Sequence, residues 1–325
     1  MGTTYHIKVV IPIADTNGYL PSHIKAKKEI KEGIDAKLKA VNQSMSVYSK
    51  SSEISAFNKA SKNEITEISR DFAYVMSIGE RLYTITNGAW DATLKPLVDL
   101  WGFGTERQLK RLPSPETVKE RLSHTGFNHI SLSGNKNQMT SGPILEKKLD
   151  GITLDLGSIA KGFGVDAVSE MLIKNGYENF LVEIGGEVAA HGVKKPSTPW
   201  MVGVTRPDKG GNPNAIYASF ELKNRALATS GDYRNFIELE GKTYSHIINP
   251  VTGYPVSNGV VSASVISDNC TFADGLATAL MVMGAEKGVE LVNSIEGTEC
   301  LIVTRDTNGK LKDHISKEFP GSNQK

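Results

Sequence analysis

Residues 151–164 constrain the fold more than any other stretch, because they predict a strand that runs through a glycine-containing turn into a helix. Apolar residues fall at every second position up to Leu156, as on one face of a strand. After Ile159 the apolar spacing becomes helical and ends at Asn175, which is followed by glycine. The N-terminus of this helix, with Lys161 as a nearby cation, suits a phosphate or pyrophosphate.

This stretch matches neither of two common nucleotide-binding motifs. Lys161 precedes Gly162, whereas a Walker motif places lysine after the last glycine, and the spacing G-x-G-x-x-G is absent. A turn that needs glycine only for its backbone geometry remains an alternative.

Length and charge limit the class of protein. The chain has 325 residues and a net charge of +1, so it lacks the basic excess that captures nucleic acid or an anionic membrane. Cys270 and Cys300 have no metal-type spacing, and no apolar run reaches the length of a membrane span. We find no repeat and no linker, so residues 1–325 are predicted to form a single domain.

Helical and strand patterns occupy different parts of the chain. Helices are predicted at 69–86, capped by Ser69, and near 117–125. The part from 179 to 267 is mostly β, with strands predicted at 179–184, 201–204, 215–222, 236–239, 243–248 and 260–266.

A helix from about 271 to 280 carries a candidate metal site. Thr271 is a plausible N-cap, and Asp274 and Thr278 are four residues apart and share one face. A carboxylate and a hydroxyl are oxygen ligands that Mg²⁺ accepts, and Ser158 could complete the site if the segments meet. Aspartate in a first helical turn is also favoured by the helix dipole alone.

Other polar segments admit two interpretations each. His246, in the predicted strand, could be a general base or a phosphate donor, or a hydrogen-bonded structural residue. The small-residue turn expected at 228–235 could bind phosphate or cap a hairpin. Tyr48 could contact a flat ligand or pack in the core, and Asp91 could be a cap or a ligand contact.

Taken together, these segments resemble the ApbE-type FAD:protein FMN transferases, also called flavin transferases. The similarity covers nearly the whole chain and keeps the family's order. Its blocks are residues 1–5, 45–48, 88–91 with 96–97, 155–162, 185–186, 229–234, 246–250 with 252–253, and Asp274 with Thr278.

The resemblance implies transfer of FMN from FAD to a threonine, or less often a serine, hydroxyl of a partner flavoprotein, with release of AMP. The implied acceptors are membrane subunits of sodium-pumping NADH:quinone oxidoreductases and related electron-transfer complexes. Two alternatives are a Mg²⁺-dependent FAD pyrophosphatase, which would give free FMN and AMP, and a non-catalytic FAD-binding protein.

The resemblance also assigns site residues. Mg²⁺ is expected at Ser158, Asp274 and Thr278, and His246 is the candidate catalytic histidine, with Asp274 catalytic through the metal. FAD contacts are expected at Met1, Tyr48, Ala89, Trp90, Asp91, Asp155, Lys161 and Ile248.

Two residues depart from the family's pattern. Asn249 stands where the family often has aspartate, which puts a carboxylate role there in doubt. Trp90 replaces the common phenylalanine or methionine, and we expect it to serve as a broad apolar wall.

The implied fold is α+β: a compact, two-lobed arrangement of largely antiparallel sheet with packed helices and FAD in the central cleft. The family's first block lies just downstream of a signal peptide and a lipidated cysteine. We therefore expect a periplasmic protein, anchored by lipid to the inner membrane, whose leader lies upstream of Met1.

Overall fold

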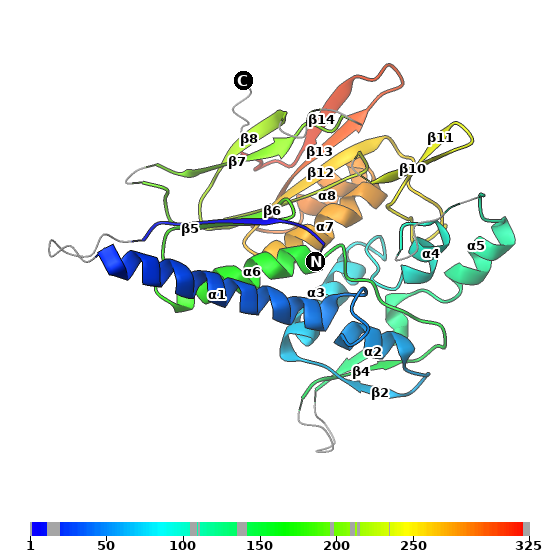
Figure 1. Ribbon diagram of the computed structural model, residues 1–325. Helices are drawn as coiled ribbons and strands as arrows, with labels where there is room; N and C mark the ends of the chain where they lie inside the picture. Colours follow the sequence, from blue (N-terminus) through cyan, green and yellow to red (C-terminus); the bar gives the residue numbers. More distant parts are fainter. Residues whose placement is uncertain are drawn as a thin grey trace.

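The computed structural model describes residues 2–11, 20–104, 109, 111–134, 142–195, 198–208, 212, 215–233 and 235–320. A seven-stranded sheet with the order β1-β5-β6-β9-β12-β13-β14 lies at its centre, and all neighbouring strands in it are antiparallel (Figure 1). These strands are β1 (Tyr5–Val9), β5 (Phe180–Ile184), β6 (Glu187–His191), β9 (Arg225–Gly231), β12 (Val260–Ser267), β13 (Glu299–Arg305) and β14 (Leu311–Ile315). All 8 residues of β12 are buried, so the middle of the sheet is covered on both faces.

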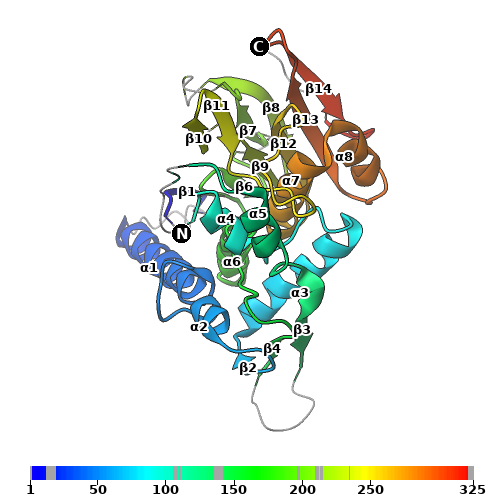
Figure 2. The same cartoon turned by 90° about the vertical axis from the view of Figure 1, so that its right-hand side faces the viewer.

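Helices cover one face of this sheet and a hairpin covers the other (Figures 1 and 2). The covering elements are α1 (Leu20–Met45), α6 (Ala160–Lys174), α7 (Cys270–Met283), α8 (Ala285–Val292) and the hairpin of β7 (Trp200–Thr205) and β8 (Ile216–Leu222). Side chains alternate between the faces, as expected for strands. In β5, Phe180 and Val182 pack with Val165 of α6, whereas Leu181 packs with Trp200 and Phe220 of the hairpin.

A smaller part of the molecule lies beyond α6 and α7 (Figure 1). It contains a sheet of order β2-β4-β3, in addition to several short helices. Its elements are α2 (Glu53–Lys59), β2 (Ile65–Glu67), α3 (Arg70–Ile85), α4 (Lys95–Leu100), α5 (Pro115–Leu122), η1 (Phe127–His129), β3 (Ile130–Ser133) and β4 (Ile144–Lys147). The hairpin of β10 (Phe236–Leu239) and β11 (Lys242–Ser245) packs against α4 and Trp101. One hydrophobic cluster extends from Phe57 and Phe72 through Leu276 to Ile302, so both parts share a core. The predicted α+β fold with largely antiparallel sheets is confirmed.

Helices α6 and α7 cross at a glycine. A Cβ atom added to Gly162 would lie 2.3 Å from the carbonyl oxygen of Cys270 and 2.8 Å from Cβ of Asp274. Only a residue without a side chain allows this approach. The close crossing brings Asp274, which is buried, beside the first turn of α6.

The start of α7 is held by a carboxylate from α6. Asp166 accepts hydrogen bonds from the backbone N–H of Thr271 at 2.8 Å and from its hydroxyl at 2.6 Å. The N-cap is Asn269, whose side chain accepts from the N–H of Phe272 at 2.7 Å. The prediction of Thr271 as the N-cap is therefore wrong, because its hydroxyl is engaged by the neighbouring helix.

The strand predicted before α6 is absent. Residues 152–156 are extended and their apolar side chains are fully buried, but they belong to no sheet. The side chain of Asn58 stands where a neighbouring strand would be: its Oδ1 accepts from the N–H of Leu154 at 2.7 Å and its Nδ2 donates to the Leu154 carbonyl at 2.9 Å. The N–H of Asp155 donates to the carbonyl of Ala92 at 2.8 Å. The predicted alternation of buried apolar residues is confirmed, but the amide side chain of Asn58 takes the place of a neighbouring strand.

The other predicted elements are mostly confirmed. The helix at 69–86 is α3, with Ser69 as its N-cap, and the helix near 117–125 is α5, which begins two residues earlier. The predicted strands correspond to β5, β7, β8, β10, β11 and β12, although β11 ends at Ser245, before His246. The turn predicted at 228–235 is wrong at its start, because β9 continues to Gly231.

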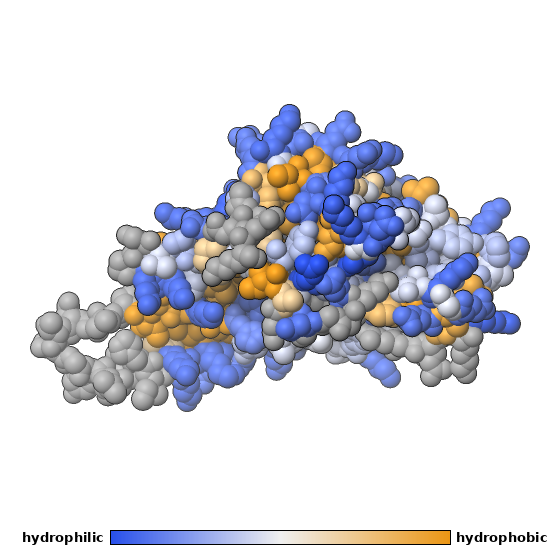
Figure 3. Space-filling view, turned by 90° about the horizontal axis from the view of Figure 1, so that it is seen from above, coloured by the Kyte–Doolittle hydropathy of each residue, from blue (hydrophilic) through white to orange (hydrophobic). Residues whose placement is uncertain are grey.

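The surface is mainly hydrophilic in the view of Figure 3, with smaller hydrophobic areas between the polar ones. Across the residues that the structure describes, none of the helices has the length and apolar character needed to cross a bilayer.

Candidate active site

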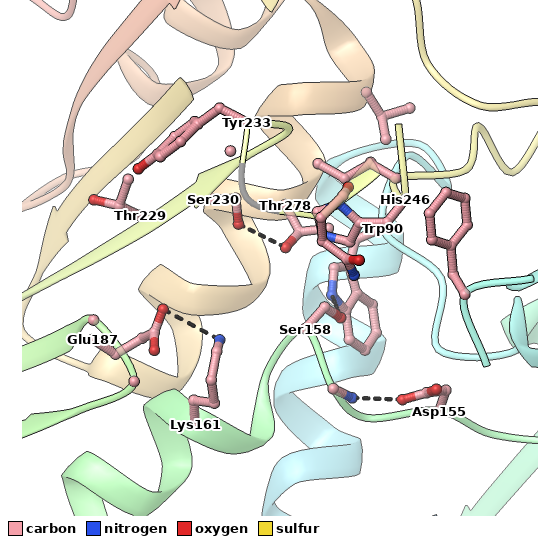
Figure 4. A pocket seen from close by; sticks show the side chains of 18 of the residues that line it. Trp90, Asp155, Ser158, Lys161, Glu187, Thr229, Ser230, Tyr233, His246 and Thr278 are labelled. Atoms are coloured by element: carbon pink, nitrogen blue, oxygen red, sulfur yellow. Dashed lines mark hydrogen bonds and ion pairs between the residues drawn. The ribbon is translucent and has the colours of Figure 1, made fainter. Parts of the chain in front are cut away.

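A cavity of about 520 Å³ lies where the two parts of the molecule meet (Figure 4). This volume is within the roughly 300–1,000 Å³ that is usual for small-molecule sites. The segment before α4, the start of α6, the β5–β6 turn, β7, β9, the residues after β11 and α7 all contribute to its wall. Residues predicted from the sequence that line it are Ala89, Trp90, Asp91, Asp155, Ser158, Lys161, His246, Ile248 and Thr278.

Two predicted residues do not line this cavity in the structure. Asp274 lies behind the wall, 1% exposed, and reaches the cavity through Lys161. Tyr48 is 67% exposed and is not among the lining residues. Met1 lies outside the described residues.

Lys161 is held between two buried carboxylates. Its Nζ lies 3.0 Å from Oδ1 and 3.3 Å from Oδ2 of Asp274, and 3.2 Å from Oε1 of Glu187. Oδ2 of Asp274 also accepts from the backbone N–H of Gly162 at 2.9 Å. This N–H belongs to the first turn of α6, so the positive end of that helix already faces a carboxylate.

The charges of this cluster depend on one another. Burial alone lowers the pKa of Lys161, but the charges of Asp274 and Glu187 outweigh it and raise that pKa. Burial, followed by repulsion from Asp274, raises the pKa of Glu187, and burial raises the pKa of Asp274. The ammonium is therefore a permanent cation, and the spot beside Asp274 favours positive charge.

Hydroxyl groups form the other polar part of the cavity wall. Oγ1 of Thr278 lies 2.9 Å from Oγ of Ser230, and Oγ of Ser158 accepts from the indole N–H of Trp90 at 3.1 Å (Figure 4). Trp90 is 1% exposed. It borders the cavity with little exposed surface, and its indole N–H also holds the Ser158 hydroxyl.

His246 lies just beyond the end of β11. Its Nδ1 is 2.9 Å from the carbonyl oxygen of Asn235. A carbonyl can only accept, so Nδ1 carries the proton and Nε2 is the nitrogen that accepts protons when the ring is neutral. The ring of Phe103 meets the imidazole edge-on, with centroids 6.2 Å apart.

Asn249 forms the turn after His246. Its Oδ1 accepts from the N–H groups of Val251 and Thr252, at 2.8 and 3.2 Å. An aspartate accepts in the same way at such a turn. The amide therefore keeps the turn that an aspartate would form.

Asp91 and Asp155 direct their carboxylates at nearby backbone. Asp91 accepts from the N–H and hydroxyl of Thr93 and, at 3.2 Å, from the N–H of Phe127. Asp155 accepts from the N–H of Gly157 at 2.8 Å. Burial raises the pKa of both carboxyls, and these hydrogen bonds oppose the shift. Each therefore fixes a segment of the cavity wall.

The residues fit a hard cation such as Mg²⁺. One carboxylate, Asp274, and the hydroxyls of Ser158 and Thr278 are oxygen donors, and the ammonium of Lys161 beside Asp274 marks a position that attracts positive charge. Within the described ranges there is no group of three or more His, Cys, Asp and Glu side chains that could hold a metal.

Sequence reasoning missed Glu187, and it included Ser230 only as part of the segment 228–235. Glu187 is 2% exposed, and its Oε2 has no hydrogen-bond partner among the described residues. Its position directly after the Gly185-Gly186 turn was the available signal, because a carboxylate at a tight turn beside an anion site needs a partner. Ser230 lies in the segment that was predicted to be a turn, so its strand geometry went unrecognised.

Comparisons with known proteins show which proteins the chain resembles. The model of the ApbE family matches residues 1–302. Relatives named FAD:protein FMN transferase include one from Vibrio cholerae, 39% identical over 98% of this chain and 89% of its own, and one from Haemophilus influenzae, 40% identical over 94% and 85%. The solved flavin transferase ApbE of Vibrio cholerae has a TM-score of 0.83 at 37% identity, covering 98% of this chain and 95% of that one. The apo flavinyl transferase ApbE of Pseudomonas stutzeri also reaches 0.83, at 32% identity over 98% and 93%.

Proposed function

The chain belongs to the ApbE family, and from this premise we propose that it transfers FMN from FAD to a threonine or serine hydroxyl of a target flavoprotein in a Mg²⁺-dependent reaction. Its relatives' shared name identifies them as transferases that use FAD and a protein acceptor. The observation that carries the proposal is the cluster at one cavity: a lysine held by two buried carboxylates, with the Ser158 and Thr278 hydroxyls nearby.

The reaction is a displacement at phosphorus. The acceptor oxygen forms a bond to the phosphorus of the FMN half, the bond from that phosphorus to the bridging oxygen breaks, and AMP leaves. Negative charge grows on the bridging and terminal oxygens, so catalysis depends on positioning and neutralisation. Lys161, with its pKa raised, supplies a fixed positive charge at the cavity wall.

Asp274, Thr278 and Ser158 would hold the Mg²⁺. When bound, the ion would neutralise pyrophosphate oxygens and make AMP a better leaving group. Glu187 keeps Lys161 partnered by a carboxylate when Asp274 is shared with a divalent cation.

His246 is the base that we propose for the acceptor hydroxyl. The Asn235 carbonyl fixes the tautomer, so Nε2 is the atom that takes the proton. Replacing His246 with Asn should lower kcat by about 10²- to 10⁴-fold and leave FAD affinity nearly unchanged. Single-turnover transfer and equilibrium FAD binding measure the two effects separately.

Acceptors and location follow from the family resemblance. We propose that the acceptors are subunits of sodium-pumping NADH:quinone oxidoreductases or related electron-transfer complexes, and that the protein acts in the periplasm, held there by a lipid anchor. Fractionation of cells that express the full-length gene tests the location.

The deciding experiment combines the protein, FAD, Mg²⁺ and an acceptor domain with a threonine target. Intact mass of the acceptor is followed together with free AMP and free FMN. A mass gain of one FMN on the acceptor, with an equal amount of AMP, supports the transferase. The acceptor should be one that a characterised relative modifies. With such an acceptor, free FMN and AMP without the mass gain would point to a pyrophosphatase. Unchanged FAD would point to a binding protein.

A further inference from the structure

The indole of Trp90 contacts Ser158, one of the residues proposed above to hold Mg²⁺. Its Nε1–H donates to Oγ of Ser158 at 3.1 Å, across 68 residues of sequence (Figure 4). Both residues border the cavity, and Trp90 is only 1% exposed. The bond therefore links an enclosed donor to a cavity-facing hydroxyl.

The surrounding residues hold the indole in one place. A Cβ atom on Gly79 would lie 2.8 Å from Cη2 of Trp90, and one on Gly275 would lie 3.3 Å from Nε1. The ring of Phe127 packs against the indole at 6.0 Å between centroids, and the backbone N–H of Trp90 donates to Oγ1 of Thr86 at 3.1 Å. Two glycines thus provide the space, and the backbone is anchored at the same residue.

A count of donors and acceptors shows what this bond does to Ser158. A serine hydroxyl has one proton to donate and two lone pairs, while an indole N–H can only donate. With one lone pair taken by Trp90, the proton and the second lone pair must point elsewhere, and the hydroxyl borders the cavity. That combination suits an oxygen that binds a cation and donates to a phosphate oxygen at the same time.

We propose that Trp90 is a positioning residue, whose indole N–H orients the Ser158 hydroxyl toward the cation and pyrophosphate of FAD. This inference rests on the proposed function. A side chain that filled the space without a donor would leave the hydroxyl free to rotate, and each FAD molecule would have to order it on binding.

A double-mutant cycle tests the proposal. FAD affinity is measured by calorimetry for the wild type, Trp90→Phe, Ser158→Ala and the double variant. Each titration is done with and without Mg²⁺ and without acceptor. Release of AMP is followed to exclude turnover of FAD. Trp90→Phe should weaken FAD binding about 3- to 10-fold when Ser158 is present, the effect of one hydrogen bond. In the Ser158→Ala background the same change should alter FAD affinity less than about twofold.

Trp200→Phe is the matched control. Trp200 is buried and its Nε1–H also donates at 3.1 Å, to the carbonyl of His191, but it does not line the cavity. The Trp200→Phe variant loses the same indole N–H elsewhere in the fold. Its FAD affinity should stay at the wild-type value, while its thermal stability falls.

The outcomes separate the inference from the function. If Trp90→Phe and Ser158→Ala weaken FAD binding independently, Trp90 acts by packing alone and the inference is overturned. If Mg²⁺ does not strengthen FAD binding in the wild type, the proposed metal role fails, and the coupling measured with FAD alone still decides whether Trp90 orients Ser158.

Discussion

Replacing Gly162 with alanine should damage stability and activity together, because the α6–α7 crossing has no room for a methyl group. The new Cβ would start 2.3 Å from the Cys270 carbonyl oxygen, and real Cβ contacts are essentially never shorter than 3.0 Å, so the helices must separate by about 0.7 Å. Overpacking of this kind costs about 1–3 kcal/mol. The separation also weakens the 2.9 Å bond from the Gly162 N–H to Asp274, and hydrogen bonds to charged groups are worth about 1.5–3 kcal/mol.

Alanine regains up to about 1 kcal/mol of helix propensity over glycine. We therefore expect the free energy of unfolding to fall by about 2–4 kcal/mol, measured by urea denaturation. Because Asp274 moves with α7, FMN transfer should fall about 10- to 100-fold even where the variant is fully folded, as expected for a shift approaching 1 Å.

Gly33→Ala is the control. It makes the same change within a helix, α1, but its nearest neighbour is the flexible end of Met171, at 3.3 Å from the added Cβ. This variant should be as stable as the wild type or slightly more stable, with normal transfer. A Gly162→Ala protein with wild-type stability and turnover would refute the view that the crossing sets the position of Asp274.

Three further perturbations test other parts of the structure. Asn58→Ala removes both bonds to Leu154 and should lower the free energy of unfolding by about 2–3 kcal/mol, with faster amide hydrogen exchange at 152–157 and weaker FAD binding; unchanged exchange would contradict the role of Asn58. Asp274→Ala should abolish transfer at saturating Mg²⁺ while FAD still binds, and near-normal transfer in that variant would refute the metal assignment. Burial lowers the pKa of Lys147 below its usual 10.5, so the unfolded chain holds that proton more tightly. The unfolding free energy of the wild type should therefore rise relative to Lys147→Met between neutral pH and pH 10.5, and parallel pH profiles would exclude this effect.

Periodic patterns in the sequence predicted the helices and strands that depend only on neighbouring residues. The helix capped by Ser69 and the strands β8, β10 and β12 follow from spacing and turn residues alone. What failed depends on partners far away in the chain. The stretch before α6 has the alternation of a strand, but whether it joins a sheet was decided by Asn58, almost a hundred residues earlier.

The site shows the same division. Lys161, Ser158 and Thr278 were recognised from short motifs that match a known family, and all three line one cavity. The partners that fix them were not predicted: Glu187 for Lys161 and Ser230 for Thr278. Each of these contacts joins a helix to a strand distant in the chain, and no local rule predicts how a helix packs on a sheet.

The pairing of β1 with β5 has a consequence for how the protein is made. Tyr5 lies opposite Ile184, and the carbonyl of Thr4 accepts from the N–H of Gly185, a residue of the cavity wall. Closing a loop of about 180 residues costs roughly 5 kcal/mol of chain entropy beyond a constant term. Strand β1 must therefore wait until the roughly 180 residues up to β5 have been synthesised before its edge of the sheet can form. This wall of the flavin pocket is completed late in folding, and a nascent chain that ends before β5 cannot assemble it.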